Sequence, residues 1–330
     1  MMRAQAAHQV RRYPGVRRII VLLLACVAFA PSAPAVAIPA PGAPDCRIFP
    51  ASNVWHSDIS QLPVHPRSAA WLASMDASTT DLHPNFGPSF GKPQPYGIPY
   101  DVVGSGHARV PVSFDYDDES DAGPYPVGDD TTIEMGSDRH ALIIDRDACK
   151  LYELYALRRV DGQWRAGSGA IFDLTSNRLR PRTWTSADAA GLPIFVGLLR
   201  RDEVAAGRID HAIRFTASRT SRRFLWPARH QAGATDDPNV PPMGARFRLR
   251  ASFDISGFRA DTRVVLRAMK RYGLILADNG SDWYFGGTSE DGWNNDMLDE
   301  LKTIPASRFV AVDVSSLRID PDSARARQPN

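Results

Sequence analysis

Short alternating apolar runs separated by turn residues constrain the fold of this chain more than any other feature of its sequence. "HALIID" (140–145) and "KLYELYALRRV" (150–160) flank the short turn "RDAC", which predicts a β-hairpin. Pro and Gly are frequent between residues 46 and 130 and disfavour long helices there. The same strand signal recurs in segments 109–116, 169–174, 211–216, 223–228 and 245–255.

Helical signals are fewer. The clearest is "DTRVVLRAMKRYG" (261–273), in which Asp261 can cap the first turn, an apolar stripe follows, and Gly273 ends the helix. Shorter candidates are 67–77, 200–207 and 294–304. We therefore predict a mainly β fold, a β-sandwich or jelly roll with peripheral helices, and keep an α+β fold as the alternative.

The N-terminus has the pattern of an export signal. Five Arg residues precede the apolar run "IIVLLLACVAFA" (19–30), and Ala35-Val36-Ala37 offers a small-x-small cleavage site. The run is too short to cross a bilayer, so we predict a signal peptide over 1–37 rather than an anchor. The protein is then secreted or periplasmic, with no stable membrane insertion after cleavage.

Composition shifts divide the rest of the chain. Residues 38–45 are rich in Pro and Ala and predict a linker, 46–318 a single globular domain, and 319–330 a flexible tail. Because residues 1–37 hold five Arg and no acid, cleavage changes the net charge from +2 to −3. No basic surface for nucleic acid is therefore expected.

Two cysteines follow the leader. Cys46 and Cys149 in an exported chain predict one disulfide that closes a loop of about a hundred residues, the alternative being two separate buried thiols.

Standard catalytic and cofactor motifs are missing from the sequence. It contains no HExxH, no GxSxG, no Walker A loop and no GxGxxG. The histidines show no paired-ligand spacing. We therefore predict neither a cofactor nor a metal site.

Carboxylates that interrupt apolar runs are the remaining candidates for chemistry. Asp173, Asp254 and Asp278 are the predicted catalytic residues, with Asp282 as a further candidate. A carboxyl group inside an apolar strand must be paired or have a raised pKa, and glycoside hydrolysis needs two carboxyl groups facing each other. The alternative for each is a structural acid.

Asp278 lies in "LILADNGSDWYFGG" (274–287), where Asp-Asn-Gly predicts a hairpin turn. The segment 174–195 has little regular signal, and we expect it to lie over a cleft.

Aromatic residues accompanied by amides suit sugars, which offer apolar faces and many hydroxyls. The alternative for each aromatic residue is a place in the core. The predicted substrate-binding residues are Trp184, Asn177, His211, Trp226, His230, Asn279 and Trp283.

Several longer segments carry a resemblance to a family. "DRHALIIDRDACKLYELY", "PPMGARFRLRASFDI" and "YGLILADNGSDWY" are among the stretches similar to a group of exported bacterial proteins of uncharacterised function. The resemblance covers roughly residues 46–315. It implies one exported domain, and it implies no activity and no catalytic residue.

Three functions fit these observations. The first is a secreted carbohydrate-active protein that acts on a polysaccharide or glycan with a carboxylate pair, as a glycoside hydrolase or a lyase. The second is a non-catalytic exported module that binds a glycan or cell-wall polymer. The third is a structural protein of the cell envelope, in which the aromatic residues all belong to the core.

Overall fold

The computed structural model describes residues 37–327, and the predicted hairpin around "RDAC" forms within them. β4 (Ala141–Asp145) and β5 (Lys150–Tyr155) pair antiparallel, with Asp145 opposite Lys150. β2 (Tyr100–Val103) joins β4 on one side and β8 (Ser168–Asp173) joins β5 on the other. All residues of β4 are buried, which agrees with the apolar run Ala141–Ile144, and the buried Asp145 at its end pairs with Arg109.

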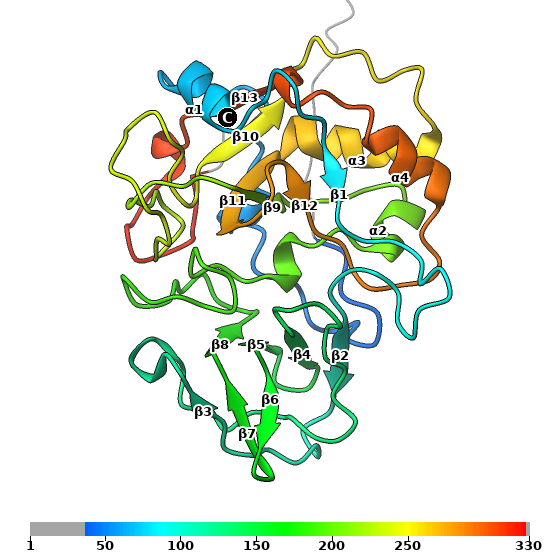
Figure 1. Ribbon diagram of the computed structural model, residues 1–330, viewed down its shortest axis with the longest axis vertical. Helices are drawn as coiled ribbons and strands as arrows, with labels where there is room; N and C mark the ends of the chain where they lie inside the picture. The colour runs from blue at the N-terminus through cyan, green and yellow to red at the C-terminus, as the bar shows by residue number, and fades with distance from the viewer. Residues whose placement is uncertain (1–36, 328–330) are drawn as a thin grey trace, which may run out of the picture. The chain divides into compact units, whose positions relative to one another are not determined.

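The largest sheet has six strands in the order β1-β12-β9-β11-β10-β13. Its two central strands, β9 and β11, run parallel. In Figure 1 this sheet lies above the four-stranded sheet. The strands are β1 (His83–Pro84), β9 (Ile213–Ala217), β10 (Arg246–Leu249), β11 (Leu274–Asn279), β12 (Tyr284–Phe285) and β13 (Phe309–Val312).

A third, small sheet lies at the opposite end of Figure 1 and has the order β3-β7-β6. It consists of β3 (Ser113–Phe114), β6 (Arg158–Val160) and β7 (Gln163–Ala166). The predicted strand at 109–116 is thus reduced to two residues, and 223–228 forms no strand. The peptide bond between Trp226 and Pro227 in that segment is cis.

Helices are short and lie at the periphery, so the prediction of a mainly β fold with peripheral helices is confirmed (Figure 1). The α-helices are α1 (Ser68–Ser74), α2 (Arg201–Ala205), α3 (Ala260–Arg271) and α4 (Asn295–Leu301). The 3₁₀ helices are η1 (Val54–His56), η2 (Asp117–Glu119), η3 (Phe195–Gly197), η4 (Ala306–Arg308) and η5 (Ser315–Leu317).

Helix α3 forms where the apolar stripe predicted it, and its stripe is buried against the sheet. Its N-cap is Arg259, and Asp261 lies within the first turn, where its charge favours the positive end of the helix dipole. Gly273 follows the helix with φ +72°, a conformation that glycine adopts without a steric penalty.

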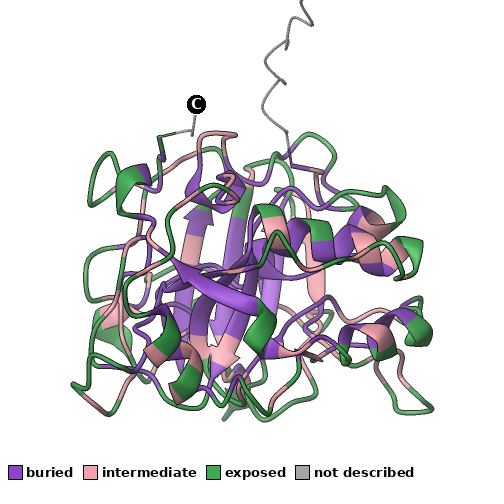
Figure 2. Cartoon of the chain, turned by 90° about the horizontal axis from the view of Figure 1, so that it is seen from above, coloured by how far each residue is buried: buried purple, intermediate pink, exposed green. Residues whose placement is uncertain are grey.

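The core is built around aromatic rings of the six-stranded sheet. Trp283 contacts Phe215, Phe247 and Phe309 at ring-centroid distances of 5.5–5.7 Å. Figure 2 shows these buried strands at the centre, with the exposed residues on the surrounding loops and helices. A smaller cluster around Tyr125 and Tyr152 fills the space between the other two sheets.

The segment 274–287 does not form the predicted hairpin. β11 and β12 lie on opposite sides of β9, β11 parallel to it and β12 antiparallel. The Asp-Asn-Gly stretch therefore carries the chain past the end of β9 rather than back along β11. Pairing with β9 on both sides satisfies the backbone of this central strand, which a local hairpin would leave open.

The predicted disulfide between Cys46 and Cys149 is confirmed and spans 103 residues of sequence. The predicted linker is packed: Ala40 and Ala43 are buried, and the Arg200 guanidinium donates to the carbonyl of Ile38 at 2.8 Å.

The predicted tail is packed as well, since Ala326 N–H donates to the Ser52 carbonyl at 2.8 Å. The predicted signal peptide, apart from Ala37, lies outside the described residues. Within residues 37–327, no helix has the length and apolar character needed to cross a membrane.

Candidate functional site

Residues of the six-stranded sheet line three neighbouring cavities. Cavity A has about 430 Å³ and is lined from both sheets, by Asp278 of β11 and by Tyr155 of β5 among others. Cavity B, of about 290 Å³, shares Asp138, Asp278 and Asn279 with cavity A. Cavity C, of about 720 Å³, shares two residues with cavity B. These are Asn85 and Glu134.

Asp278 occupies the point at which cavities A and B meet. The pairing of β11 with β9 shifts register between Leu276 and Asp278, which marks a bulge. The Ala277 carbonyl at this bulge accepts the N–H of Ala190 at 2.8 Å, so the loop 174–195 is tied to the strand. About a quarter of the Asp278 side chain remains exposed.

A buried ion pair lies directly behind Asp278. Arg214 of β9 makes a two-pronged contact with Asp188, whose side chain is fully buried; its Nε donates to Oδ2 at 2.7 Å and its Nη2 to Oδ1. Nη2 of Arg214 also lies 3.9 Å from Oδ2 of Asp278. Such a bidentate pair gives the buried Asp188 carboxyl group two strong hydrogen bonds.

The electrostatic environment favours a proton on Asp278. Burial and the neighbouring Asp188 carboxylate raise the pKa of Asp278 to about 8, although Arg214 acts in the opposite direction. The single positive charge of Arg214 cannot balance two carboxylates, and its hydrogen bonds go to Asp188. Asp278 is therefore a carboxylic acid at neutral pH that faces two cavities.

Two further carboxylates line cavity A. Glu119, at the end of η2, accepts the N–H of Thr185 at 2.9 Å, and its Oε2 lies 3.7 Å from Nε2 of His230. Asp138 is exposed and lines both cavity A and cavity B. Cavity A thus has three carboxyl groups from three separate parts of the chain.

A Glu–His pair forms part of cavity B. Nδ1 of His140 lies 2.6 Å from Oε2 of Glu134. Burial opposes a charge on His140, but the bond with Glu134 outweighs it and raises the pKa of His140. The same bond outweighs the burial of Glu134 and lowers its pKa. The pair lines cavity B together with Arg214.

Glu153 of β5 connects the loop 174–195 to the four-stranded sheet. Its carboxyl oxygens accept the N–H groups of Ile194 and Phe195, both at 2.9 Å. Burial raises the pKa of Glu153 to about 7 despite these bonds. The group is fully buried and lines none of the three cavities, so its part is to hold the loop.

Three of the predicted site residues come together in cavity A: Asp278, Asn279 and His230. The side-chain amide of Asn279 donates to the Ala232 carbonyl at 2.7 Å, and Nδ1 of His230 lies 2.8 Å from the Ala189 carbonyl. The segment 174–195 also contributes Thr185, Ser186, Ala187 and Ala189 to the lining.

The other predicted carboxylates lie elsewhere and have local partners. Asp173 and Asp254 are exposed, and each accepts the backbone N–H and the hydroxyl two residues ahead, from Thr175 and Ser256 respectively. Asp282 accepts the same pair of bonds from Ser218. Asp173 and Asp254 thus cap turns, Asp282 links two distant segments, and none of the three lines the cavities.

The remaining predicted binding residues also lie away from the cavities. Trp283 is fully buried in the core, with its indole N–H bonded to the Met75 carbonyl. His211 is buried against Glu203 at 3.1 Å. Trp226 donates to the Ser323 carbonyl, Asn177 bonds the N-terminal segment through Asn53, and Trp184 packs near Arg180.

Sequence reasoning missed most partners of Asp278. Asp188 and Arg214 carry no motif, and they meet only because β9 and the loop 174–195 converge on β11. Glu153 had a signal, because it interrupts the apolar strand "LYELY" as Asp278 interrupts "LILAD". Glu119 lies among other acidic residues, in "DDESDAG", and interrupts no apolar run.

Within residues 37–327, no cluster of three or more His, Cys, Asp or Glu side chains is arranged to hold a metal ion. Comparison of the chain with protein-family models, with curated proteins and with solved structures found no match.

Proposed function

We propose that this chain is an exported carbohydrate-active enzyme that hydrolyses a glycosidic bond, with Asp278 as the proton donor. The observation that carries the proposal is the position of the Asp278 carboxyl group, which is partly exposed where cavities A and B meet and whose pKa is raised to about 8 by burial and by Asp188. A general acid of this kind is what a glycosidic leaving group requires.

The second carboxylate in the proposal is Glu119. It lies in the same cavity and is oriented by Thr185, and His230 stands beside it. Asp278 donates its proton to the glycosidic oxygen as the bond to the anomeric carbon breaks. Glu119 takes a proton from the water that attacks that carbon, so one water is consumed and both groups return to their starting states through solvent.

Asp188 and Arg214 act through Asp278 in this scheme. Asp188 disfavours a charge on Asp278, and Arg214, which also lines cavity B, holds the Asp188 carboxyl group in place through two hydrogen bonds. We expect activity to fall as the pH rises through about 8, because Asp278 then loses the proton that it must donate.

The test is a screen of the full chain, purified after export, against a panel of neutral and uronate polysaccharides. New reducing ends report hydrolysis, and ultraviolet absorbance of unsaturated uronates reports a lyase. We expect reducing ends that Asp278→Asn and Glu119→Gln abolish. Asp282→Asn is the matched control, because this acid lies four residues away and bonds only Ser218.

A non-catalytic glycan-binding protein is the second candidate. It is favoured by the exposed rings of Phe90 and Tyr96, which offer apolar faces in cavity C. Binding of a polysaccharide without release of reducing ends or unsaturated products would favour this candidate. Full activity of Asp278→Asn would refute the proposed role of Asp278.

A further inference from the structure

Each of the three cavities shares lining residues with its neighbour. Cavity C meets cavity B at Asn85 and Glu134, and cavity B meets cavity A at Asp138, Asp278 and Asn279. They therefore adjoin one another in the order C, B, A, with the Asp278 carboxyl group lining both B and A, and we call this row of cavities the groove. A groove longer than a single cavity suits an extended ligand rather than a small molecule.

Exposed aromatic rings are confined to this groove. Among the residues that the structure describes, three aromatic side chains are largely exposed: Phe90 at 76%, Tyr96 at 55% and Tyr116 at 55%. Phe90 and Tyr96 line cavity C, and Tyr116 lines cavity A. Burying an aromatic ring stabilises a protein, so rings left exposed at both ends of the groove call for an explanation by function.

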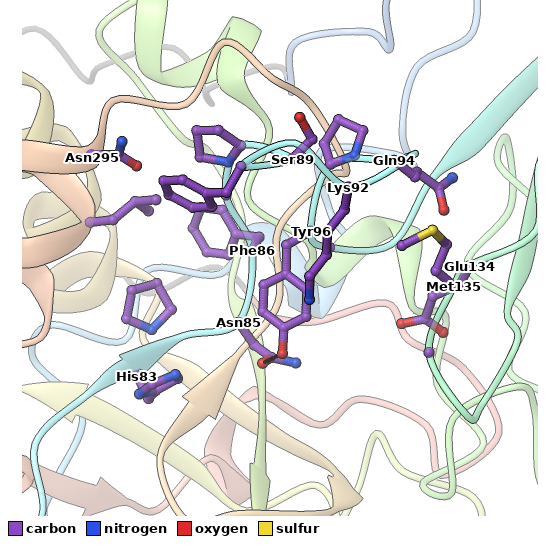
Figure 3. A pocket seen from close by; sticks show the side chains of 18 of the residues that line it. His83, Asn85, Phe86, Ser89, Lys92, Gln94, Tyr96, Glu134, Met135 and Asn295 are labelled. Carbon is purple, nitrogen blue, oxygen red and sulfur yellow. Dashed lines mark hydrogen bonds between the residues drawn. The ribbon is translucent and has the colours of Figure 1, made fainter.

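The geometry of Tyr96 suits a stacking platform. Its hydroxyl donates to Oδ1 of Asn85 at 2.5 Å, which fixes the ring. Figure 3 shows the ring between Asn85 and Lys92, with Glu134 and Met135 across the cavity. A ring held in one orientation loses little entropy when a ligand stacks on it.

The charges of the groove select the ligand further. Cavity A contains the carboxyl groups of Glu119, Asp138 and Asp278 and neither Lys nor Arg. Arg214, in cavity B, is neutralised by Asp188. An anionic chain would meet the carboxyl groups of Glu119 and Asp138 in cavity A, whereas Lys92 and Lys302 line only cavity C.

We propose that the groove formed by cavities C, B and A binds a linear, uncharged polysaccharide across several sugar units, with Tyr96 as a stacking platform remote from Asp278. This inference deepens the proposed function and rests on it only for cleavage, not for binding. It excludes uronate polymers as ligands.

The test is binding of oligosaccharides to the Asp278→Asn variant of the full chain, measured by calorimetry so that cleavage does not interfere. The probes are cello-, xylo- and chito-oligosaccharides of two to six units, and oligogalacturonates of the same lengths. We expect affinity for one neutral series to rise with length, and no binding of the uronates.

Substitutions at Tyr96 locate the platform. Tyr96→Ala is expected to weaken binding of the six-unit ligand about tenfold and that of the two-unit ligand less than twofold. Tyr96→Phe keeps the ring but loses the bond to Asn85, so it is expected to weaken binding of the six-unit ligand less than Tyr96→Ala does. Ile319→Ala, an exposed apolar side chain outside the three cavities, is the matched control and leaves binding unchanged.

Each outcome bears on one proposal separately. Absence of binding to every oligosaccharide, equal binding of uronates, or an effect of Tyr96→Ala that does not depend on ligand length would overturn the groove. Release of reducing ends by the unsubstituted chain in any of these cases would leave the proposed hydrolysis standing. Length-dependent binding without cleavage would support the groove and refute the hydrolysis.

Discussion

Replacing Asp278 by Asn tests the electrostatic account of the site through the stability of the protein. Asp278 binds a proton in the folded state up to about pH 8, whereas the carboxyl group of the unfolded chain loses it near pH 3.8. Because the folded state holds the extra proton, the free energy of unfolding falls as the pH rises from about 4 to about 8. Asn carries no proton to lose, so the variant lacks this part of the slope.

The magnitude follows from linkage. A group fully protonated only in the folded state lowers the free energy of unfolding by about 1.36 kcal/mol per pH unit. With a pKa of about 8, Asp278 keeps its proton over about two of the three units between pH 6 and pH 9. We expect the unsubstituted chain to lose roughly 2–3 kcal/mol more than Asp278→Asn over that range.

The assay is denaturant unfolding of both proteins at pH 6 and pH 9, followed by tryptophan fluorescence. Glu153, with a pKa of about 7, titrates in both proteins, so the difference between them isolates Asp278. Asp282→Asn should keep the slope of the unsubstituted chain. Equal slopes for Asp278→Asn and the unsubstituted chain would show that Asp278 is ionised at neutral pH and would refute the reasoning.

Three further predictions concern stability and are measured by the same unfolding assay. Arg214→Met should cost about 3–5 kcal/mol, because it leaves Asp188 buried without its partner, whereas Arg222→Met at an exposed ion pair should cost less than about 1 kcal/mol; similar losses would refute the role of the buried pair. Trp283→Ala should cost about 3–5 kcal/mol, and a loss below about 1 kcal/mol would contradict its place in the core. Replacing both disulfide cysteines by Ala should cost roughly 4–5 kcal/mol for a loop of 103 residues, and unchanged stability would contradict the loop-entropy argument.

Local patterns predicted the elements of the fold well. The β4–β5 hairpin and helix α3 depend on residues close together in sequence, and both form as expected. The Asp-Asn-Gly stretch was a correct signal for a break after β11 and a wrong one for a hairpin. The difference lies in β9, which is about 60 residues away in sequence and pairs with both neighbouring strands.

The candidate site could be predicted only in part. Asp278 was found because an acid inside an apolar strand needs an explanation, and His230 and Asn279 share its cavity. Asp188 and Arg214 could not be found, because nothing in their own neighbourhoods shows that they meet. Trp283 was predicted to bind substrate but lies in the core, because its residue type does not show whether an aromatic side chain faces the core or the solvent.

The residues that line the groove come from two parts of the chain, one inside the loop closed by the disulfide and one beyond it. Residues 46–149 form a covalent ring, and this ring carries Tyr96, Glu119 and Asp138. Asp278 and His230 belong to the open chain beyond it. No covalent cross-link joins the two walls, so non-covalent contacts such as the one between His230 and Glu119 hold the groove at its width. The disulfide therefore constrains one wall covalently, whereas the spacing between the two walls depends on hydrogen bonds and ion pairs.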